Sequence, residues 1–187
     1  MGTMSGTRKY LFGETDSWLA EHWVASDDRV RGGRSISHLD YASEASARVR
    51  FHGELDIKAL GGAGFASQRS PEQCSWDLSQ FEGLNLAIHD GDGKKYTLVI
   101  KDTVAAERPD GRLYSTVSWE YDFEGKTGEV CVPWEDLKPT YRGKPAPDAA
   151  PLDRGNIKSI SFMMRSFFGE QEGPFNLELI HVAATSF

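Results

Sequence analysis

The stretch LNLAIHDGDGKKYTLVIKD, residues 84–102, holds two runs of alternating large apolar side chains on either side of Asp90-Gly91-Asp92-Gly93. A side-chain period of two is that of a β-strand with one buried face. Glycine supplies the positive φ that a tight turn needs. The stretch therefore predicts a β-hairpin whose core-facing residues are Leu84, Leu86, Ile88, Tyr96, Leu98 and Ile100.

The same alternation recurs along most of the chain. It is found in ARVRFHGEL (47–55), TVSWEYDFE (116–124), GEVCVPW (128–134), IKSISFMMRS (157–166) and PFNLELIHVAA (174–184). We expect roughly eight to ten short strands, with no regular alternation of strands and helices, which is typical of antiparallel all-β domains. The predicted fold class is all-β, an antiparallel β-sandwich of the jelly-roll type.

Two segments depart from this pattern. TDSWLAEHWV (15–24) predicts a short N-terminal helix, which Asp16 or Ser17 would cap. KPTYRGKPAPDAAPLDRG (138–155) contains four prolines, which exclude a helix or a central strand and indicate a surface loop.

Size and charge limit the organisation and the partners. A chain of 187 residues has room for one core, so we expect one domain over residues 10–187. Residues 1–9 are expected to be a flexible leader that includes residues foreign to the natural protein, before Met4. The net charge of −7 opposes attraction to nucleic acid or to anionic lipid, so we expect neither as a partner.

The cysteines and the hydropathy pattern bear on location. Cys74 and Cys131 are the only cysteines and lie far apart in the sequence, which indicates neither a disulfide framework nor a zinc site. No apolar run is long enough to span a bilayer, and the start has no signal-peptide hydrophobic region. We expect an intracellular protein without membrane insertion.

Signatures of catalysis, metal binding and cofactor binding are missing from the sequence. The five histidines are scattered, and there is no HExxH or GxSxG motif. Gly62 and Gly64 have dinucleotide-fingerprint spacing without the third glycine, and we interpret them as a turn or bulge. We therefore expect no catalytic residues, no metal site and no cofactor.

Polar residues in the predicted connections are the candidates for a binding site. They lie around Gly32-Gly33, around Trp76, in the proline-rich loop and at the end of a hydrophobic strand, and loops on a sandwich gather at its rims. Such acids and arginines form either a structural ion network or a recognition surface. The candidates are Asp27, Asp28, Arg31, Arg34, Arg69, Trp76, Asp77, Arg142 and Arg165.

Five motifs in order resemble the CIA30 family, which is named for the complex I intermediate-associated protein of mitochondria. They are SDDRVRGGRS, FHGEL with GGAGFASQR, DLSQFEGLNLAIHDGDGKKYTL, VCVPWEDLKPTYRGKPAPDAAPLD and GPFNLELIHVAA. The resemblance implies a galactose-binding-like β-sandwich and a non-catalytic assembly factor that holds intermediates of NADH:ubiquinone oxidoreductase. It also implies mitochondrial residence, whereas the missing amphipathic presequence favours the cytoplasm if that absence is genuine.

One residue departs from the family's Asp-x-Val-Met-Gly-Gly-x-Ser pattern. Asp28, Val30, Gly32-Gly33 and Ser35 match it, but Arg31 stands where the family usually has methionine. Because arginine favours water or an acid over an apolar contact, this loop is expected to meet a different partner or none.

Three hypotheses of function remain at this point. The first is a protein-binding adaptor that uses Asp28, Arg34, Arg69, Trp76 and Arg142. The second is a carbohydrate-binding or small-ligand module, suggested by the fold resemblance and by Trp76, Trp119 and Trp134, although Trp119 lies on the apolar side of its strand. The third is an acid-base enzyme with carboxylates such as Asp27, Asp28 or Asp90 in a rim pocket.

Overall fold

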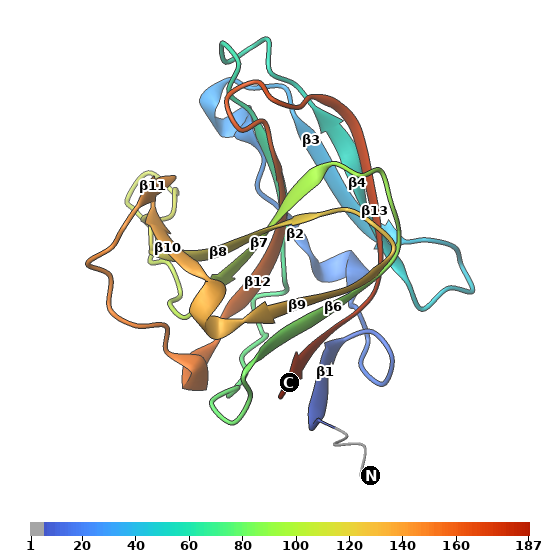
Figure 1. Cartoon of the computed structure of the whole chain (residues 1–187). Helices are drawn as coiled ribbons and strands as arrows, with labels where there is room; N and C mark the ends of the chain where they lie inside the picture. Colours follow the sequence, from blue (N-terminus) through green and yellow to red (C-terminus); the bar gives the residue numbers. More distant parts are fainter. Residues whose placement is uncertain (1–5) are drawn as a thin grey trace.

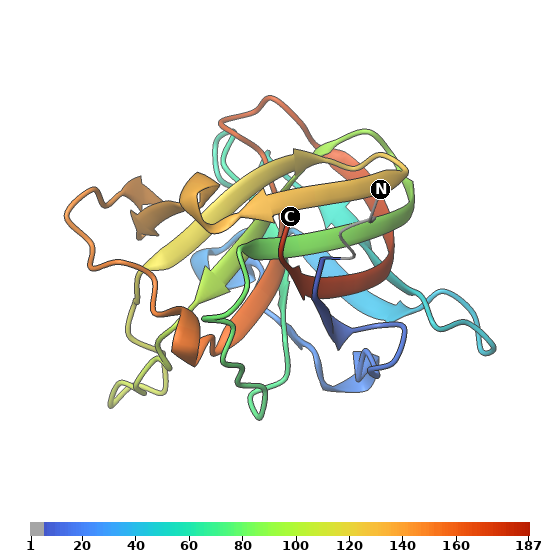
Figure 2. The same cartoon turned by 60° about the horizontal axis from the view of Figure 1, so that its bottom comes forward.

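The structure is a computed structural model that describes residues 6–187, and it consists of two antiparallel β-sheets that face each other (Figure 1). The six-stranded sheet has the order β3-β4-β13-β6-β9, with β1 paired to β13. Its strands are β1 (Arg8–Phe12), β3 (Ile36–Tyr41), β4 (Val49–Leu55), β6 (Gly83–Gly91), β9 (Gly128–Pro133) and β13 (Gly173–Thr185). Figure 2 shows β9, β6, β13 and β1 side by side as one layer.

The seven-stranded sheet has the order β11-β10-β8-β7-β12-β5-β2. Its strands are β2 (Val24–Ala25), β5 (Phe65–Arg69), β7 (Lys95–Lys101), β8 (Ser118–Glu124), β10 (Lys138–Tyr141), β11 (Lys144–Pro145) and β12 (Ser159–Arg165). Short 3₁₀ turns complete the described elements: η1 (Ala20–His22), η2 (Asp28–Arg31), η3 (Trp134–Asp136) and η4 (Arg154–Asn156). The prediction of an all-β antiparallel jelly-roll sandwich is confirmed.

The core lies between the sheets and is built from the residues that the alternation predicts. Leu86 of β6, Leu98 of β7 and Phe162 of β12 are fully buried. The rings of Phe51 and Tyr96 meet edge to face across the core, with centroids 6.1 Å apart. Each such large apolar side chain contributes about 1.5–3 kcal/mol when it leaves water, so the two sheets cannot separate without a large loss of stability.

The prediction of a hairpin over residues 84–102 is wrong, because β6 and β7 belong to different sheets. β6 pairs with β13 and β9, whereas β7 pairs with β8 and β12. The turn between them, where Gly93 has a φ of 78°, crosses from one sheet to the other. Asp92 holds this crossing, since its carboxylate accepts hydrogen bonds from Tyr96 Oη at 3.0 Å and from the Asn176 N–H at 2.9 Å. A period of two specifies a buried face but not the neighbouring strand.

The predicted N-terminal helix is also not formed. Residues 20–22 make only the 3₁₀ turn η1, and Leu19 before it is left-handed with a φ of 51°. Two indole groups set this path: Trp18 Nε1 donates to the Ile180 carbonyl, and Trp23 Nε1 donates to the Trp18 carbonyl. Both tryptophans are buried, whereas His22 between them is exposed.

The proline-rich segment forms part of the sheet edge as well as a loop. β10 and β11 pair with each other at the end of the seven-stranded sheet, and β10 pairs with β8. Proline is tolerated on such an edge because its missing N–H need not serve a neighbour. β10, which contains Pro139, has a neighbouring strand on each side, so the prediction that the whole segment is a surface loop is wrong for residues 138–145.

Candidate functional site

Asp27 and Asp28 lie inside the protein, at 9% and 0% exposure, and not at a rim. The Asp28 carboxylate accepts hydrogen bonds from the Ser35 N–H at 3.0 Å, the Ser35 hydroxyl at 2.8 Å and the Phe65 N–H at 3.0 Å. Asp27 accepts from the Ser37 N–H at 3.1 Å, the Ser37 hydroxyl at 2.6 Å and the Ser67 N–H at 3.0 Å. The two carboxylates therefore tie the segment before β3 to β3 and to β5.

The Gly-Gly pair is part of the same structural unit. Gly32 ends η2 in the left-handed region with a φ of 82°. A Cβ atom on Gly33 would collide with the Asp28 carboxyl group. The sequence DDRVRGGRS is thus explained locally by a buried carboxylate pair and by the close approach of the backbone to it.

A second group of side chains, most of them polar, lies on the seven-stranded sheet, on the side away from the core, which we name the outer face. Its side chains alternate along the strands with the core-facing residues, and the register aligns them in rows across the sheet. They are Phe65, Ser67, Arg69, Thr97, Val99, Lys101, Glu120, Asp122, Ser159, Ser161, Met163 and Arg165.

Arg165 organises the centre of the outer face. From β12 its guanidinium reaches across β7 to two acids of β8: Nη1 lies 3.0 Å from Glu120 Oε2, and Nη2 lies 3.1 Å from Asp122 Oδ1. Thr97 donates to that same Asp122 oxygen at 2.7 Å, and Thr140 of β10 donates to Glu120 Oε1 at 3.0 Å. The network therefore joins four strands of the sheet.

Burial and aromatic contact fix this network in place. The Glu120 side chain is 11% exposed and that of Arg165 is 24% exposed. The Arg165 guanidinium carbon lies 4.8 Å from the centre of the Phe167 ring. Arg165 Nε is buried without a hydrogen-bond partner, so the group is held by its other donors and by the ring.

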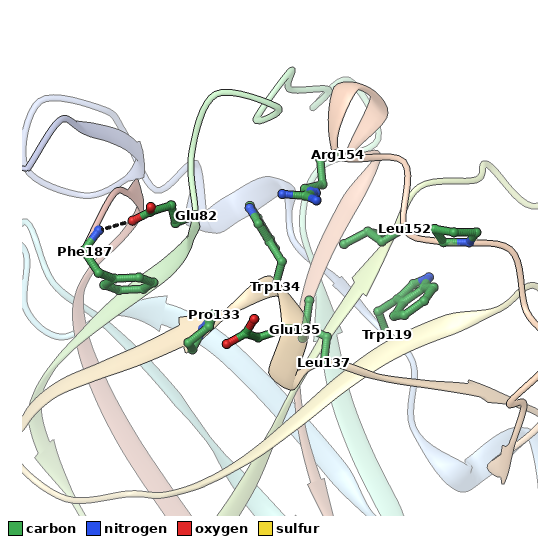
Figure 3. Close-up of a pocket in the computed structure, with 10 residues that line it drawn as sticks. Glu82, Trp119, Pro133, Trp134, Glu135, Leu137, Leu152, Arg154 and Phe187 are labelled. Carbon is green, nitrogen blue, oxygen red and sulfur yellow. Dashed lines mark hydrogen bonds between the residues drawn. The ribbon is translucent and has the colours of Figure 1, made fainter.

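A hollow of about 560 Å³ lies near the end of the six-stranded sheet (Figure 3). Its walls combine flat apolar side chains with a few charged ones: Glu82, Trp119, Pro133, Trp134, Glu135, Leu137, Pro151, Leu152, Arg154 and Phe187. Trp134 Nε1 donates to the Phe81 carbonyl at 2.7 Å, and Glu82 accepts from the Phe187 N–H at 2.6 Å. Trp119, expected in the core, packs against the core cluster, and the exposed part of its side chain lines this hollow.

Within residues 6–187, no group of three or more His, Cys, Asp or Glu side chains is placed to hold a metal ion. The described part of the chain also has no helix long and apolar enough to cross a membrane. Cys74 and Cys131 are both free, and burial raises the pKa of the Cys74 thiol.

The family model described as complex I intermediate-associated protein 30 (CIA30) matches residues 10–179. The chain belongs to the CIA30 family. A Schizosaccharomyces pombe protein, itself uncharacterised, is 42% identical over 182 residues, which cover 93% of this chain and 82% of the relative.

The sandwich of this CIA30 member is similar to solved carbohydrate-binding modules. A family 11 module from Clostridium thermocellum, solved with a β-1,3-1,4-mixed-linked tetrasaccharide, has a TM-score of 0.64 at 16% identity and covers 98% of both chains. The family 11 module of the cellulase Lic26A-Cel5E from the same organism has a TM-score of 0.60 at 16% identity, over 94% of this chain and 95% of the module. At these identities the likeness concerns the fold.

The candidate residues predicted from the sequence do not form one site in this CIA30 chain. Arg69 and Arg165 are on the outer face, and the Arg31 guanidinium carbon is 5.7 Å from the centre of the Phe65 ring on that face. Arg142 lies in the β10–β11 turn, where its Nε donates to the Ser115 hydroxyl at 3.2 Å. Arg34 is exposed.

Trp76 and Asp77 lie apart from the Arg165 network. Trp76 pairs with Ile157 through an isolated bridge, and its ring packs edge to face against Phe12, with centroids 5.5 Å apart. Asp77 accepts hydrogen bonds from the Ser79 hydroxyl and N–H, which lower the pKa of its carboxyl group. Trp76 and Asp77 therefore stabilise the loop that contains them.

The sequence did not single out Glu120, Asp122, Thr97 and Lys101 as site residues. The available signal was the polar half of the alternation in TVSWEYDFE and KKYTLVIKD. That signal marks a wet face, but strand order is needed to bring Arg165 of β12 to the acids of β8.

Proposed function

We propose that this CIA30 chain is a non-catalytic protein-binding domain that recognises a protein client with the outer face of its seven-stranded sheet. The observation that carries the proposal is the Arg165–Glu120–Asp122 network, which is preassembled and half-buried on a face that the core does not require. Arginine held in a rigid, partly desolvated setting is typical of residues that dominate protein interfaces.

The positions of the candidate acids support a role without catalysis. The oxygens of Asp27 and Asp28 accept buried hydrogen bonds that hold the strands. Asp90 is exposed at the end of β6, and its carboxylate accepts from the Gly91 N–H. An acid-base mechanism needs groups within hydrogen-bond reach of one substrate, and these three do not line the hollow of Figure 3.

The family's description supports a proposal for the client and the location. The family is described by its association with complex I intermediates. The proposed client is a respiratory complex I assembly intermediate, the proposed action is that of a chaperone-like adaptor, and the proposed location is the mitochondrion.

Affinity capture with matched variants tests this function. Arg165→Ala removes the centre of the outer face, and Glu120→Gln removes one of its charges while keeping the shape. Arg48→Ala is the control, because it breaks a comparable pair on the six-stranded sheet, where Arg48 Nε lies 2.6 Å from Glu178. Quantitative mass spectrometry should identify a complex I subunit or assembly protein with the wild type and the Arg48 variant, and lose it with the other two. The absence of any stable protein partner, or equal loss from all three variants, would refute the proposal.

A carbohydrate or small-ligand module is the second candidate, and the hollow of Figure 3 favours it. The face of an indole such as Trp119 stacks on the apolar face of a sugar ring, and Glu135 and Arg154 offer hydrogen-bond partners to hydroxyl groups. Calorimetric titration with mixed-linked glucan oligosaccharides should then show binding that Trp119→Ala abolishes. No heat of binding across a glucan series would remove this candidate.

A further inference from the structure

Lys101 is a half-buried cation without an acidic partner. It lies at the end of β7 on the outer face, and its Nζ donates to the Thr116 hydroxyl at 2.8 Å. Among the ion pairs of residues 6–187 none includes Lys101. A charge held in this way loses hydration, and the hydrogen bond that it makes is to a neutral acceptor.

Arg69 places a second cation close to the first. In the sheet order β7-β12-β5, Lys101 is opposite Ser159 of β12, and Ser161 of β12 is opposite Arg69 of β5. Two long cationic side chains therefore flank two half-buried serines on the same face. Burial lowers the pKa of Lys101 and the charge of Arg69 lowers it further, whereas Glu120 opposes them.

The acids nearby do not neutralise this pair. Glu120 already has partners, because one of its oxygens accepts a hydrogen bond from Arg165 and the other accepts one from Thr140. Arg69 contacts Glu72 at 3.3 Å, but the Glu72 side chain is 82% exposed, and such surface pairs contribute little. The Lys101 end of the outer face thus keeps an excess of positive charge in a chain of net charge −7.

We propose that Lys101 and Arg69, together with the hydroxyls of Ser159 and Ser161, form a cradle for a carboxylate side chain of the protein client. An arginine fork and a lysine ammonium, with hydroxyl donors between them, match the acceptor oxygens of one carboxylate. The cradle deepens the proposed function and rests on it, since it lies on the face assigned to the client.

The neighbouring charges favour a protein segment over a polyanion. Glu120 and Asp122 lie on the next strand of the same face, and they would repel the repeated charges of a nucleic acid or of an anionic lipid surface. An isolated Asp or Glu, flanked by neutral or basic residues, can pair with Lys101 and Arg69 without placing further negative charge beside Glu120 and Asp122. We therefore infer a mixed-charge segment with at least one acid.

The cradle is tested with the full chain and a defined probe. The probe is a capped Gly-Gly-Asp-Gly-Gly peptide, compared with its Asn counterpart and with inorganic phosphate, in amide-resolved NMR titrations. We expect saturable shifts around Lys101, Ser159 and Ser161 with the acidic peptide, and affinity reduced about tenfold or more in Lys101→Met and Arg69→Gln. Lys101→Arg should restore binding, and the exposed Lys58→Met should leave it unchanged; the same spectra report whether each variant is folded.

Three results would overturn the cradle: equal binding of the neutral peptide, unchanged binding by a folded Lys101→Met variant, or saturation by phosphate without binding of the acidic peptide. Capture of the client separates this inference from the function. If Lys101→Met still captures the client as the wild type does, the cradle is wrong and the function stands. If the wild type captures no client, the function fails whatever the peptide does.

Discussion

Replacing Asp28 by alanine should destabilise the protein severely, because it leaves buried donors without an acceptor. Three groups lose their partner: the N–H and hydroxyl of Ser35 and the N–H of Phe65, at 2.8–3.0 Å from the carboxylate. Asp28 is 0% exposed, so water cannot easily replace it. An unsatisfied buried donor costs about 1–3 kcal/mol, and the hydroxyl can turn toward the Asp56 carbonyl, 3.3 Å away. The two N–H groups that stay unpaired, of Ser35 and Phe65, give an expected loss of unfolding free energy of about 2–6 kcal/mol.

Urea unfolding, followed by tryptophan fluorescence, measures this loss. Asp90→Ala is the matched control, since Asp90 is exposed and accepts one local bond, and it should change the unfolding free energy by less than about 0.5 kcal/mol. A loss below about 1 kcal/mol for Asp28→Ala would refute the structural role of the carboxylate pair. Asp28 would then again be a candidate for binding.

Three further outcomes are expected. Gly33→Ala should lower the urea midpoint, because its methyl group meets the Asp28 carboxyl; an unchanged midpoint would contradict the close approach. Tyr96→Phe should lower the unfolding free energy in urea by about 1–2 kcal/mol, because Asp92 loses the hydrogen bond from the Tyr96 hydroxyl. Burial and Asp92 raise the pKa of Tyr96 in the wild type, so spectrophotometric titration should find one tyrosine that ionises only when the protein unfolds. Burial lowers the pKa of His181 below its unfolded value of about 6.5, so the stability that neutral His181 contributes is fully present above pH 6.5 and is lost as pH falls through the lower folded pKa. Between pH 7.5 and pH 5 the unfolding free energy should therefore fall more in the wild type than in His181→Gln. An equal fall in both proteins would contradict this.

The sequence predicted the buried face of each strand but not its neighbours. Leu84, Leu86, Leu98 and Ile100 are buried as the alternation indicates. Whether a short connection folds back into a hairpin or crosses to the opposite sheet depends on tertiary contacts, such as those of Asp92 with Tyr96 and Asn176. Such contacts join residues far apart in the chain, and the alternation does not contain them.

The charged residues around Gly32-Gly33 illustrate a second limit. Acids beside arginines in a segment with almost no large apolar residue indicate a surface, and Arg34 is indeed exposed. Asp27 and Asp28 are buried instead, because serine hydroxyls and backbone N–H groups of β3 and β5 satisfy them. The prediction included a structural network of ions, whereas the partners are neutral.

Only part of the outer face could be predicted from the sequence. The sequence predicts Arg69 and Arg165 as candidates, and its alternation indicates the polar half of β8. Their meeting with Glu120 and Asp122 depends on the sheet order, which places β7 between β8 and β12. The sequence does not predict Lys101 as a site residue, because its lack of an ion-pair partner depends on the three-dimensional arrangement of the strands.

Site-specific photo-crosslinking tests the central claim most directly. A photoreactive amino acid replaces Met163 on the outer face or, as a control, the exposed His38 of β3 on the six-stranded sheet. The account predicts a covalent adduct with the client from position 163 and none from position 38. An adduct from position 38 with none from position 163 would show that the client binds the other sheet.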